Sequence, residues 1–187
     1  AYAFFRAIRN AASEQGIDLG RTMPVASCSL AEPELVEIGP EAAAGHLSSS
    51  VYFASVDTPA NRAFVSAYHA AYPEAGPTSA DAEASFIAVH LLARAVRQAG
   101  TADMGAVRAA LPQVALEAPQ GQVRIDRDNR HAYLTPRIGV SNDRFGFDVI
   151  YEAPAPVKPD PYLVWQEVRV EARPQRRPAN LRLVVRS

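Results

Sequence analysis

The sequence predicts an α/β fold with a mainly parallel sheet. Over the first 75 residues, segments with strand character alternate with segments of helical periodicity. Two further helical segments and then several short β-like segments follow. Alternation of this kind is typical of chains in which helices cover a parallel sheet. With 187 residues, of which 48% are hydrophobic and 21% charged, the chain is long and apolar enough to bury a sizeable core.

Three helices are expected in the first half of the chain. Residues 1–16 carry apolar side chains at helical spacing. In residues 31–39, Pro33 suits the first turn, and the acids beside it suit the positive end of the helix dipole. The third helix is predicted to begin with Thr58 as its N-cap and Pro59 at its first helical position.

Two strands are expected between these helices. The first is a short buried strand from Pro24 to Ser27, which small hydroxyl residues close. The second is the alternating segment HLSSSVYF, residues 46–53. Its alternation predicts Phe53 on the apolar face and Tyr52 on the polar face.

The strongest helix is predicted from Ala80 to Ala99, with Thr78 and Asp81 as a capping box and Gly100 after its end. Its apolar stripe is predicted to be Phe86, Val89, Ala93 and Val96. A shorter helix over residues 103–111 and β-like segments over residues 123–125, 138–140 and 147–151 follow.

Two loops are candidates for holding a small ligand. In a parallel sheet, the loops that follow the carboxyl ends of the strands share one edge, where open α/β proteins hold ligands. The candidate ligand residues in these loops are Ser27, Ser29, Leu30, Tyr52, Phe53, Ser55 and Asp57. They offer hydroxyls and aromatic faces without a lysine or arginine, which favours a neutral polar solute over a phosphate. Alternatively, the serines are caps, Phe53 is core and Asp57 assists Thr58 in capping.

The motifs of common catalytic and metal sites are not found. The sequence contains no G-x-S-x-G elbow, no phosphate-binding glycine loop and no H-E-x-x-H. Its single cysteine, Cys28, excludes an intrachain disulfide and a cysteine-based zinc cluster. Asp126–His131 resembles the start of a calcium loop but lacks the glycine at its sixth position. We therefore expect no enzyme activity, no metal and no cofactor.

Positive charge is concentrated at the end of the chain, although the net charge is only −1. Residues 169–187 contain six arginines and one acid, Glu171. A basic tail can bind phosphates. No aromatic platform accompanies this one, so we expect a solvated tail and no direct nucleic-acid binding.

Three longer segments resemble a known family. They are VYFASVDTPANRAFVSAYHAAYPE, EAPQGQVRIDRDNRHAYL and APVKPDPYLVW, in this order. As a set they resemble the amide-sensing negative regulators of aliphatic amidase operons and, more broadly, the solute-binding proteins for branched-chain amino acids, urea and amides. The resemblance extends from near residue 1 to about Trp165.

The resemblance implies a type I periplasmic-binding-protein fold, in which two α/β lobes joined by three crossings hold a ligand between them. It implies that residues 1–75 belong to the second lobe and that residues 76–144 return to the first. Residues 145–168 would cross back as a crossover and a strand of the second lobe, and residues 169–187 would form the basic tail. Under this division the loops Ser27–Leu30 and Tyr52–Asp57 face the cleft.

The resemblance also implies a function. The chain would reversibly bind a small amide-like or amino-acid-like solute and act as a cytoplasmic negative regulator through an RNA-binding antiterminator protein. The alternative is a periplasmic solute-binding component of an ABC importer, which would dock to a membrane permease. The family also has an N-terminal half, which supplies most of the first lobe. We therefore expect this chain to associate with that missing half or with a second copy.

Overall fold

The computed structural model describes residues 2–18, 22 and 24–161. Its helices and strands are α1 (Tyr2–Glu14), β1 (Ala26–Ser27), α3 (Glu32–Ile38), β2 (Leu47–Ser50), α4 (Pro59–Ala71), α5 (Ala80–Ala99), α6 (Met104–Ala110), the 3-10 helix η1 (Leu111–Gln113), β3 (Ala115–Ala118), β4 (Gly121–Ile125), β5 (Ala132–Tyr133), β6 (Arg137–Ser141) and β7 (Phe147–Glu152). The expected basic tail, residues 169–187, and the end of the crossover segment before it lie outside the described residues.

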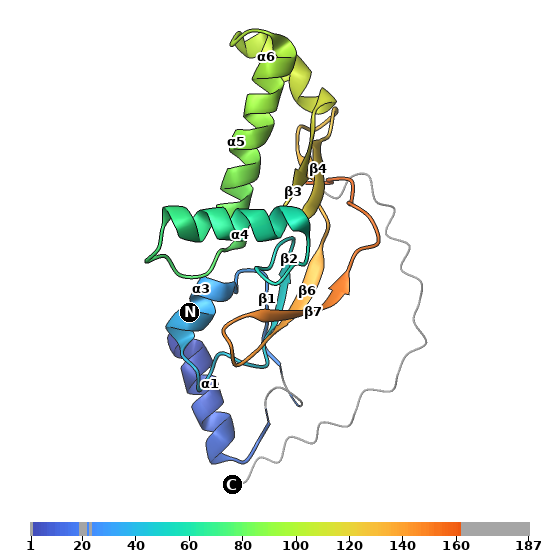
Figure 1. The fold of residues 1–187 in the computed structure, drawn as a ribbon. Helices are drawn as coiled ribbons and strands as arrows, with labels where there is room; N and C mark the ends of the chain where they lie inside the picture. Colours follow the sequence, from blue (N-terminus) through green and yellow to red (C-terminus); the bar gives the residue numbers. More distant parts are fainter. Residues whose placement is uncertain (1, 19–21, 23, 162–187) are drawn as a thin grey trace, which may run out of the picture.

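The first sheet has the strand order β1-β2-β6-β7 (Figure 1). β1 pairs with β2 in parallel, whereas β6 is antiparallel to both β2 and β7. The expectation of a mainly parallel sheet is therefore wrong for the described strands. A tight turn joins β6 to β7, with the Asn142 N–H donating to the Gly146 carbonyl at 2.9 Å, and a connection this short permits only antiparallel pairing.

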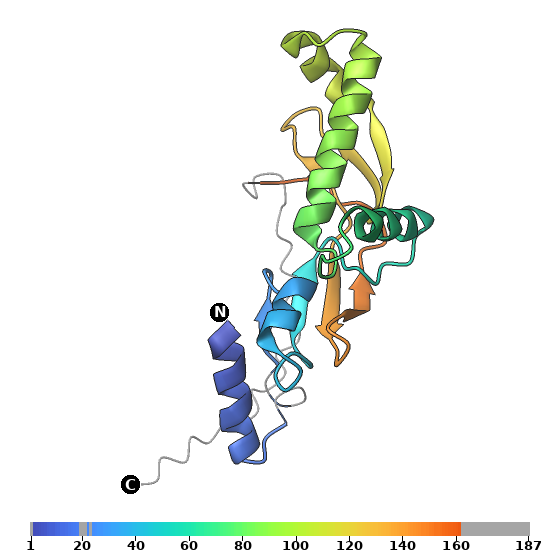
Figure 2. The same cartoon turned by 60° about the vertical axis from the view of Figure 1, so that its left-hand side comes forward.

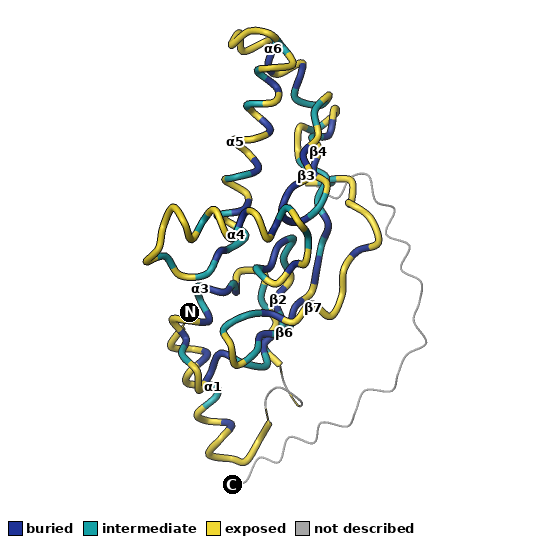
Figure 3. The backbone as a smooth tube through the Cα atoms, viewed as in Figure 1, coloured by how far each residue is buried: buried dark blue, intermediate teal, exposed yellow. Residues whose placement is uncertain are grey.

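Helices α1 and α3 contribute to the core of this sheet. Its largest fully buried apolar side chains include Leu35 and Ile38 of α3, Phe53 after β2 and Phe147 of β7. Phe5 of α1 joins the same cluster. Figure 3 shows buried backbone concentrated where these elements meet and exposed backbone on the outer turns of α1. The sheet thus buries side chains from both ends of the described sequence.

The second sheet, β3-β4-β5, is antiparallel throughout and packs against α5. Ile87 and Leu91 of α5 meet Leu116 and Val123 of the sheet in one buried cluster. The predicted bounds of α5 are confirmed, but its buried face is Glu83, Ile87, Leu91 and Ala95, and Val89 of the expected stripe is 67% exposed. The stripe was misplaced because the partner sheet, not the helix alone, decides which apolar positions are covered.

The two predicted N-caps differ in their outcome. Thr58 caps α4, accepting the Asn61 N–H at 3.0 Å, as predicted. The N-cap of α5 is Ser79, whose hydroxyl accepts the Ala82 N–H, and not Thr78. Thr78 is buried and bonds to the Tyr52 hydroxyl instead.

Three stretches of chain connect the two sheets. They are residues 72–79 before α5, residues 134–136 before β6, and residues 153–157 after β7. The last two run side by side, because the Ala153 N–H donates to the Pro136 carbonyl at 2.9 Å and the Val157 N–H to the Leu134 carbonyl at 2.8 Å. Figure 2 shows the elongated shape that results, with α5 extending away from the first sheet.

The pairing of β6 bears on the expected lobe boundary. The resemblance implies that residues 137–141 belong to the first lobe, together with the rest of residues 76–144. In the structure, however, four register pairs join β6 to β2 of the first sheet. β6 therefore belongs with residues 26–50 in one sheet. The change of sheet falls at residues 134–136, about ten residues earlier than residue 144.

Candidate functional site

A cavity of ≈ 420 Å³ lies between the loop that follows β1 and the start of α5. It is lined by Cys28, Ser29, Leu30, Ala31, Pro33, Glu34, Ser50, Ser79, Ala80 and Asp81. The loop belongs to the first sheet, and α5 covers the second. The cavity therefore lies between the two parts of the structure, where a ligand would contact both.

Local hydrogen bonds shape both walls of this cavity. On one wall, the Ser29 N–H donates to the Ser27 hydroxyl at 3.1 Å, so the chain turns immediately after β1. The Glu34 carboxylate accepts the Ala31 N–H at 3.0 Å and thereby fixes the start of α3. On the other wall, the Ser79 cap fixes the start of α5. Short-range turn and cap chemistry thus holds the lining in place.

Among the residues that the structure describes, the lining is about half polar and half apolar, and it includes no cation. It offers the hydroxyls of Ser29, Ser50 and Ser79 and the carboxylates of Glu34 and Asp81, and no lysine or arginine is among its residues. Hydroxyls and carboxylates accept hydrogen bonds from N–H groups. The cavity is therefore suited to a small solute that carries amide or amino N–H groups, more than to an anion.

The structure brings only part of the predicted site together. Ser29 and Leu30 line this cavity. Ser27 lies in a shallower apolar hollow on the sheet, together with Ile138. Ser55 and Asp57 lie in a third hollow beside α4. The Ser55 hydroxyl already donates to the Phe147 carbonyl at 2.6 Å, and Asp57 forms an ion pair with Arg62.

Tyr52 and Phe53 require a correction, because both side chains are 1% exposed and neither faces a cleft. The Tyr52 hydroxyl donates to Asn61 Oδ1 at 2.9 Å and lies 2.9 Å from the Thr78 hydroxyl. Burial raises the pKa of this hydroxyl far above its ordinary value. The role of Tyr52 in this structure is to anchor its loop to α4 and to residues 72–79.

Replacing Tyr52 with phenylalanine is expected to lower the free energy of unfolding by about 1–3 kcal/mol, because buried Asn61 and Thr78 lose a shared partner. Urea unfolding of both proteins measures this difference. Tyr68→Phe is the matched control, since its half-buried ring lies on the same side of α4 as Phe64. Equal stability of Tyr52→Phe and the parent chain would show that the hydroxyl is solvated instead.

The sequence prediction missed the residues that α5 contributes to the cavity. Ser79 and Asp81 follow the turn cluster EAGPTS and are ordinary helix-start residues by their pattern. Their N-terminal position on the helix could be predicted, but not that it faces the β1 loop, 50 residues earlier in the chain.

Metal-binding clusters and membrane-spanning helices are two further features that bear on function. Within residues 2–18, 22 and 24–161, no three histidine, cysteine or acidic side chains gather in a way that suits a metal ion. Among the helices of the same residues, we find none with the length and apolar character that a bilayer crossing requires.

Glu32 is a buried acid close to the cavity wall. It is 1% exposed, one carboxylate oxygen accepts the Ala54 N–H at 2.7 Å, and the other oxygen has no partner. Burial raises the pKa of its carboxyl above the ordinary value. Glu32 connects the start of α3 to the loop after Phe53 and is not among the residues that line the cavity.

Comparisons with known proteins agree on a fold. The structure resembles a solute-binding protein of an ABC transporter from R. palustris, solved with 4-hydroxybenzoate, at 24% identity and a TM-score of 0.71, over 88% of this chain and 44% of that one. It also resembles a leucine binding protein from Thermotoga maritima at 22% identity and a TM-score of 0.63, over 82% and 43%. The chain thus spans less than half of each solved protein.

A third similarity is to a protein named limonene hydroxylase from Geobacillus stearothermophilus, 30% identical over 124 residues, which are 65% of this chain and 23% of that protein. The chain spans less than a quarter of that protein, so its named activity is not carried over here. The family model for the periplasmic binding protein domain matches residues 1–168. Together with the structural similarities, this match confirms the predicted type I fold in partial form, and the chain belongs to the periplasmic binding protein domain family.

Proposed function

We propose that this chain is part of the solute-binding component of an ABC importer and contributes to a cleft for a small amide-like or amino-acid-like solute. The observation that carries this proposal is the cavity between Ser29 and Ser79, whose walls come from the two parts of the structure. Closure of one part over the other would enclose a solute there. A solute drives such closure only by binding the closed form more tightly.

The lining chemistry narrows the solute class. Several similar proteins were solved with benzoates, which carry a carboxylate. Within the described part of the chain, the residues that line this cavity include two carboxylates and no cation to pair with such a ligand. A neutral amide or an amino compound fits this lining better. We retain Ser29 and Leu30 as ligand-contacting residues and add Ser79.

We further propose that the two sheets mark the two lobes. Residues up to 71, together with residues 137–152, would form the second lobe, and residues 80–133 would be the portion of the first lobe that this chain supplies. The remaining partner surface would be the exposed apolar side of α5 and α6. Val89 and Met104, which are 67% and 82% exposed, belong to it. The other half of the fold, or a second copy of the chain, would cover it.

A second function has its own support. The three quoted segments resemble amide-sensing regulators more specifically than importer components, which favours a cytoplasmic regulator acting through an RNA-binding antiterminator protein. Fractionation of cells that express the intact gene distinguishes the two. Recovery in the periplasm and capture of a permease support the importer, whereas recovery in the cytoplasm and capture of an antiterminator support the regulator.

The solute prediction is tested by calorimetric titration of the intact gene product with acetamide, leucine and benzoate. We expect acetamide, or leucine through its ammonium group, to bind, and benzoate, which has no N–H group for the Glu34 and Asp81 carboxylates, not to bind. Ser29→Ala is expected to weaken binding by about two- to tenfold, as for one hydrogen bond.

Ser66→Ala is the matched control for this titration, because Ser66 lines the separate hollow of Asp57. It is expected to leave the affinity unchanged. Weakening by Ser66→Ala with no effect of Ser29→Ala would instead place the ligand beside α4.

A further inference from the structure

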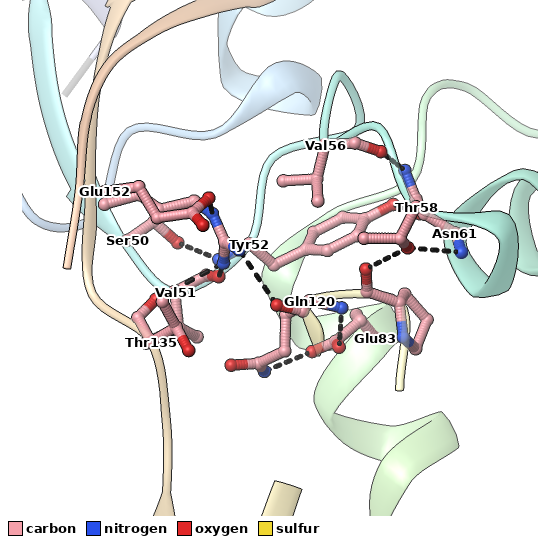
Figure 4. Close-up of polar contacts among 12 residues, drawn as sticks. Ser50, Val51, Tyr52, Val56, Thr58, Asn61, Glu83, Gln120, Thr135 and Glu152 are labelled. Carbon is pink, nitrogen blue, oxygen red and sulfur yellow. Dashed lines mark hydrogen bonds and ion pairs between the residues drawn. The ribbon is translucent and has the colours of Figure 1, made fainter. Parts of the chain in front are cut away.

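A buried polar cluster lies where the two sheets meet (Figure 4). Its members are Glu83 in the first turn of α5, Gln120 in the turn between β3 and β4, and Arg137 at the start of β6. Their exposed fractions are 0%, 2% and 3%. Burying a carboxyl and a guanidinium together is costly unless their hydrogen bonds are satisfied, so the arrangement calls for a specific reason.

Arg137 ties the two parts of the structure together. Its guanidinium donates to the carbonyls of Val51, Thr135 and Gln120 at 2.5, 3.3 and 2.9 Å. Its Nε also donates to the Glu152 carboxylate at 2.7 Å. Val51 and Glu152 belong to the first sheet region and Gln120 to the second. The guanidinium therefore spans the junction beside residues 134–136 and 153–157.

Gln120 can form a hydrogen bond with the Glu83 carboxyl in both protonation states of that carboxyl. One Glu83 oxygen accepts the Gln120 main-chain N–H at 3.2 Å, and the other accepts its side-chain amide N–H at 3.0 Å. The side-chain oxygen of Gln120 is buried and has no partner. Rotating the amide by half a turn would present this oxygen to Glu83, where it could accept a proton from the neutral carboxyl.

We propose that Glu83, Gln120 and Arg137 form a protonation-dependent joint between the two parts of the protein. With Glu83 ionised, the Gln120 amide donates to it. With Glu83 protonated, the amide rotates and accepts from it. Because Gln120 also holds Arg137 through its carbonyl, the protonation state of Glu83 sets how firmly the connecting stretches are held.

The surroundings of Glu83 give the direction of the effect. Burial raises the pKa of its carboxyl to about 7, although the hydrogen bonds from Gln120 and the charge of Arg137 oppose this shift. The Tyr52 hydroxyl also interacts with the charge of Glu83, and with that of Glu32 in α3. A group whose pKa is raised in the folded state binds more protons there than after opening. Opening of the joint therefore becomes easier as the pH rises from about 4.5 to about 7, and the dependence ends above that range.

The test compares this chain with Glu83→Gln, a permanently neutral replacement, in thermal unfolding from pH 5 to 8.5. The Tm of the parent chain is expected to fall relative to that of Glu83→Gln as the pH rises to about 7. Glu117→Gln, at an exposed position of β3, is the matched control, and its Tm should run parallel to that of the parent chain. In hydrogen exchange, the protection of residues 72–79, 134–136 and 153–157 should fall over the same pH range in the parent chain and in Glu117→Gln, but not in Glu83→Gln.

A second variant keeps the proposal testable if Glu83→Gln does not fold. Gln120→Met removes the amide that donates to ionised Glu83, so the midpoint of the Glu83 carboxyl titration, followed by carbon NMR, should move to higher pH. Parallel Tm curves for the parent chain and Glu83→Gln would overturn the proposal. An unchanged titration midpoint in Gln120→Met would overturn it as well. Neither outcome depends on ligand binding, so the importer proposal stands or fails separately.

Discussion

Replacing Phe53 with alanine is expected to lower the free energy of unfolding by about 3–5 kcal/mol, the range for a large buried aromatic. The ring is 1% exposed and packs on Phe147, with ring centroids 4.7 Å apart. Gly139 of β6 leaves room for it, since a Cβ at that position would lie 3.0 Å from the Phe53 ring. The β6–β7 hairpin, far from Phe53 in the sequence, thus closes around this side chain, and its loss leaves a cavity that the hairpin cannot easily fill.

Urea unfolding measures this loss, and Ile150→Ala is the matched control. Ile150 lies on β7 of the same sheet but is 61% exposed, so its replacement should change stability by no more than about 0.5 kcal/mol. If Phe53→Ala were as mild as Ile150→Ala, Phe53 would not fill the core of the first sheet.

The features that could be predicted from the sequence depend on chemistry within a few residues. Thr58 as N-cap and Pro59 as first helical residue predict the start of α4. The bounds of α5 follow from the helical spacing of its apolar residues and from Gly100. Pro33 in the first turn of α3 is equally local. Such signals act between neighbours in the chain and do not depend on which sheet the helix covers.

The burial of Phe53 agrees with its predicted apolar face, but the burial of Tyr52 could not be predicted in this way. Alternation assigns one to the core and the other to the outside only while the strand continues, and β2 ends at Ser50. Beyond it, Tyr52 turns toward Asn61 and Thr78, and Phe53 turns toward Phe147. Both are buried because structure covers both sides of the loop, which no period in a single sequence reveals.

The candidate cavity, too, could be predicted only where it depends on local sequence. The Ser29 wall follows a strand end, a place where ligands are expected, and it was predicted. The Ser79 wall comes from the other part of the structure, and its contribution depends on how residues 72–79 place α5. Pairing of β6 with β2 was missed for a related reason, since register between strands about 90 residues apart leaves no local signal.

Replacing Arg137 with methionine is expected to lower the free energy of unfolding by about 3–5 kcal/mol, because several hydrogen bonds from a buried charged group are lost and each contributes about 1.5–3 kcal/mol. Methionine fills part of the space but donates no hydrogen bond, so the part-buried Val51 carbonyl and the buried Gln120 carbonyl lose this donor. Glu83 also loses the positive charge that lowers the pKa of its carboxyl. Urea unfolding near pH 8 measures the loss, because Glu83 is mostly ionised there.

Two comparisons isolate the buried charge. Arg62→Met removes an ion pair with Asp57 whose side chains are 63% and 85% exposed, so we expect a change of at most about 1 kcal/mol. The double variant Arg137→Met with Glu83→Gln should lose less than the sum of the two single losses, since no buried carboxylate is left without the charge of Arg137, and the Glu152 carboxylate is 54% exposed. Strict additivity of the two single variants would show that Arg137 acts through its carbonyl partners and Glu152, and not through Glu83. A loss no larger than that of Arg62→Met would mean that solvent replaces the guanidinium and that the junction between the sheets is open to water.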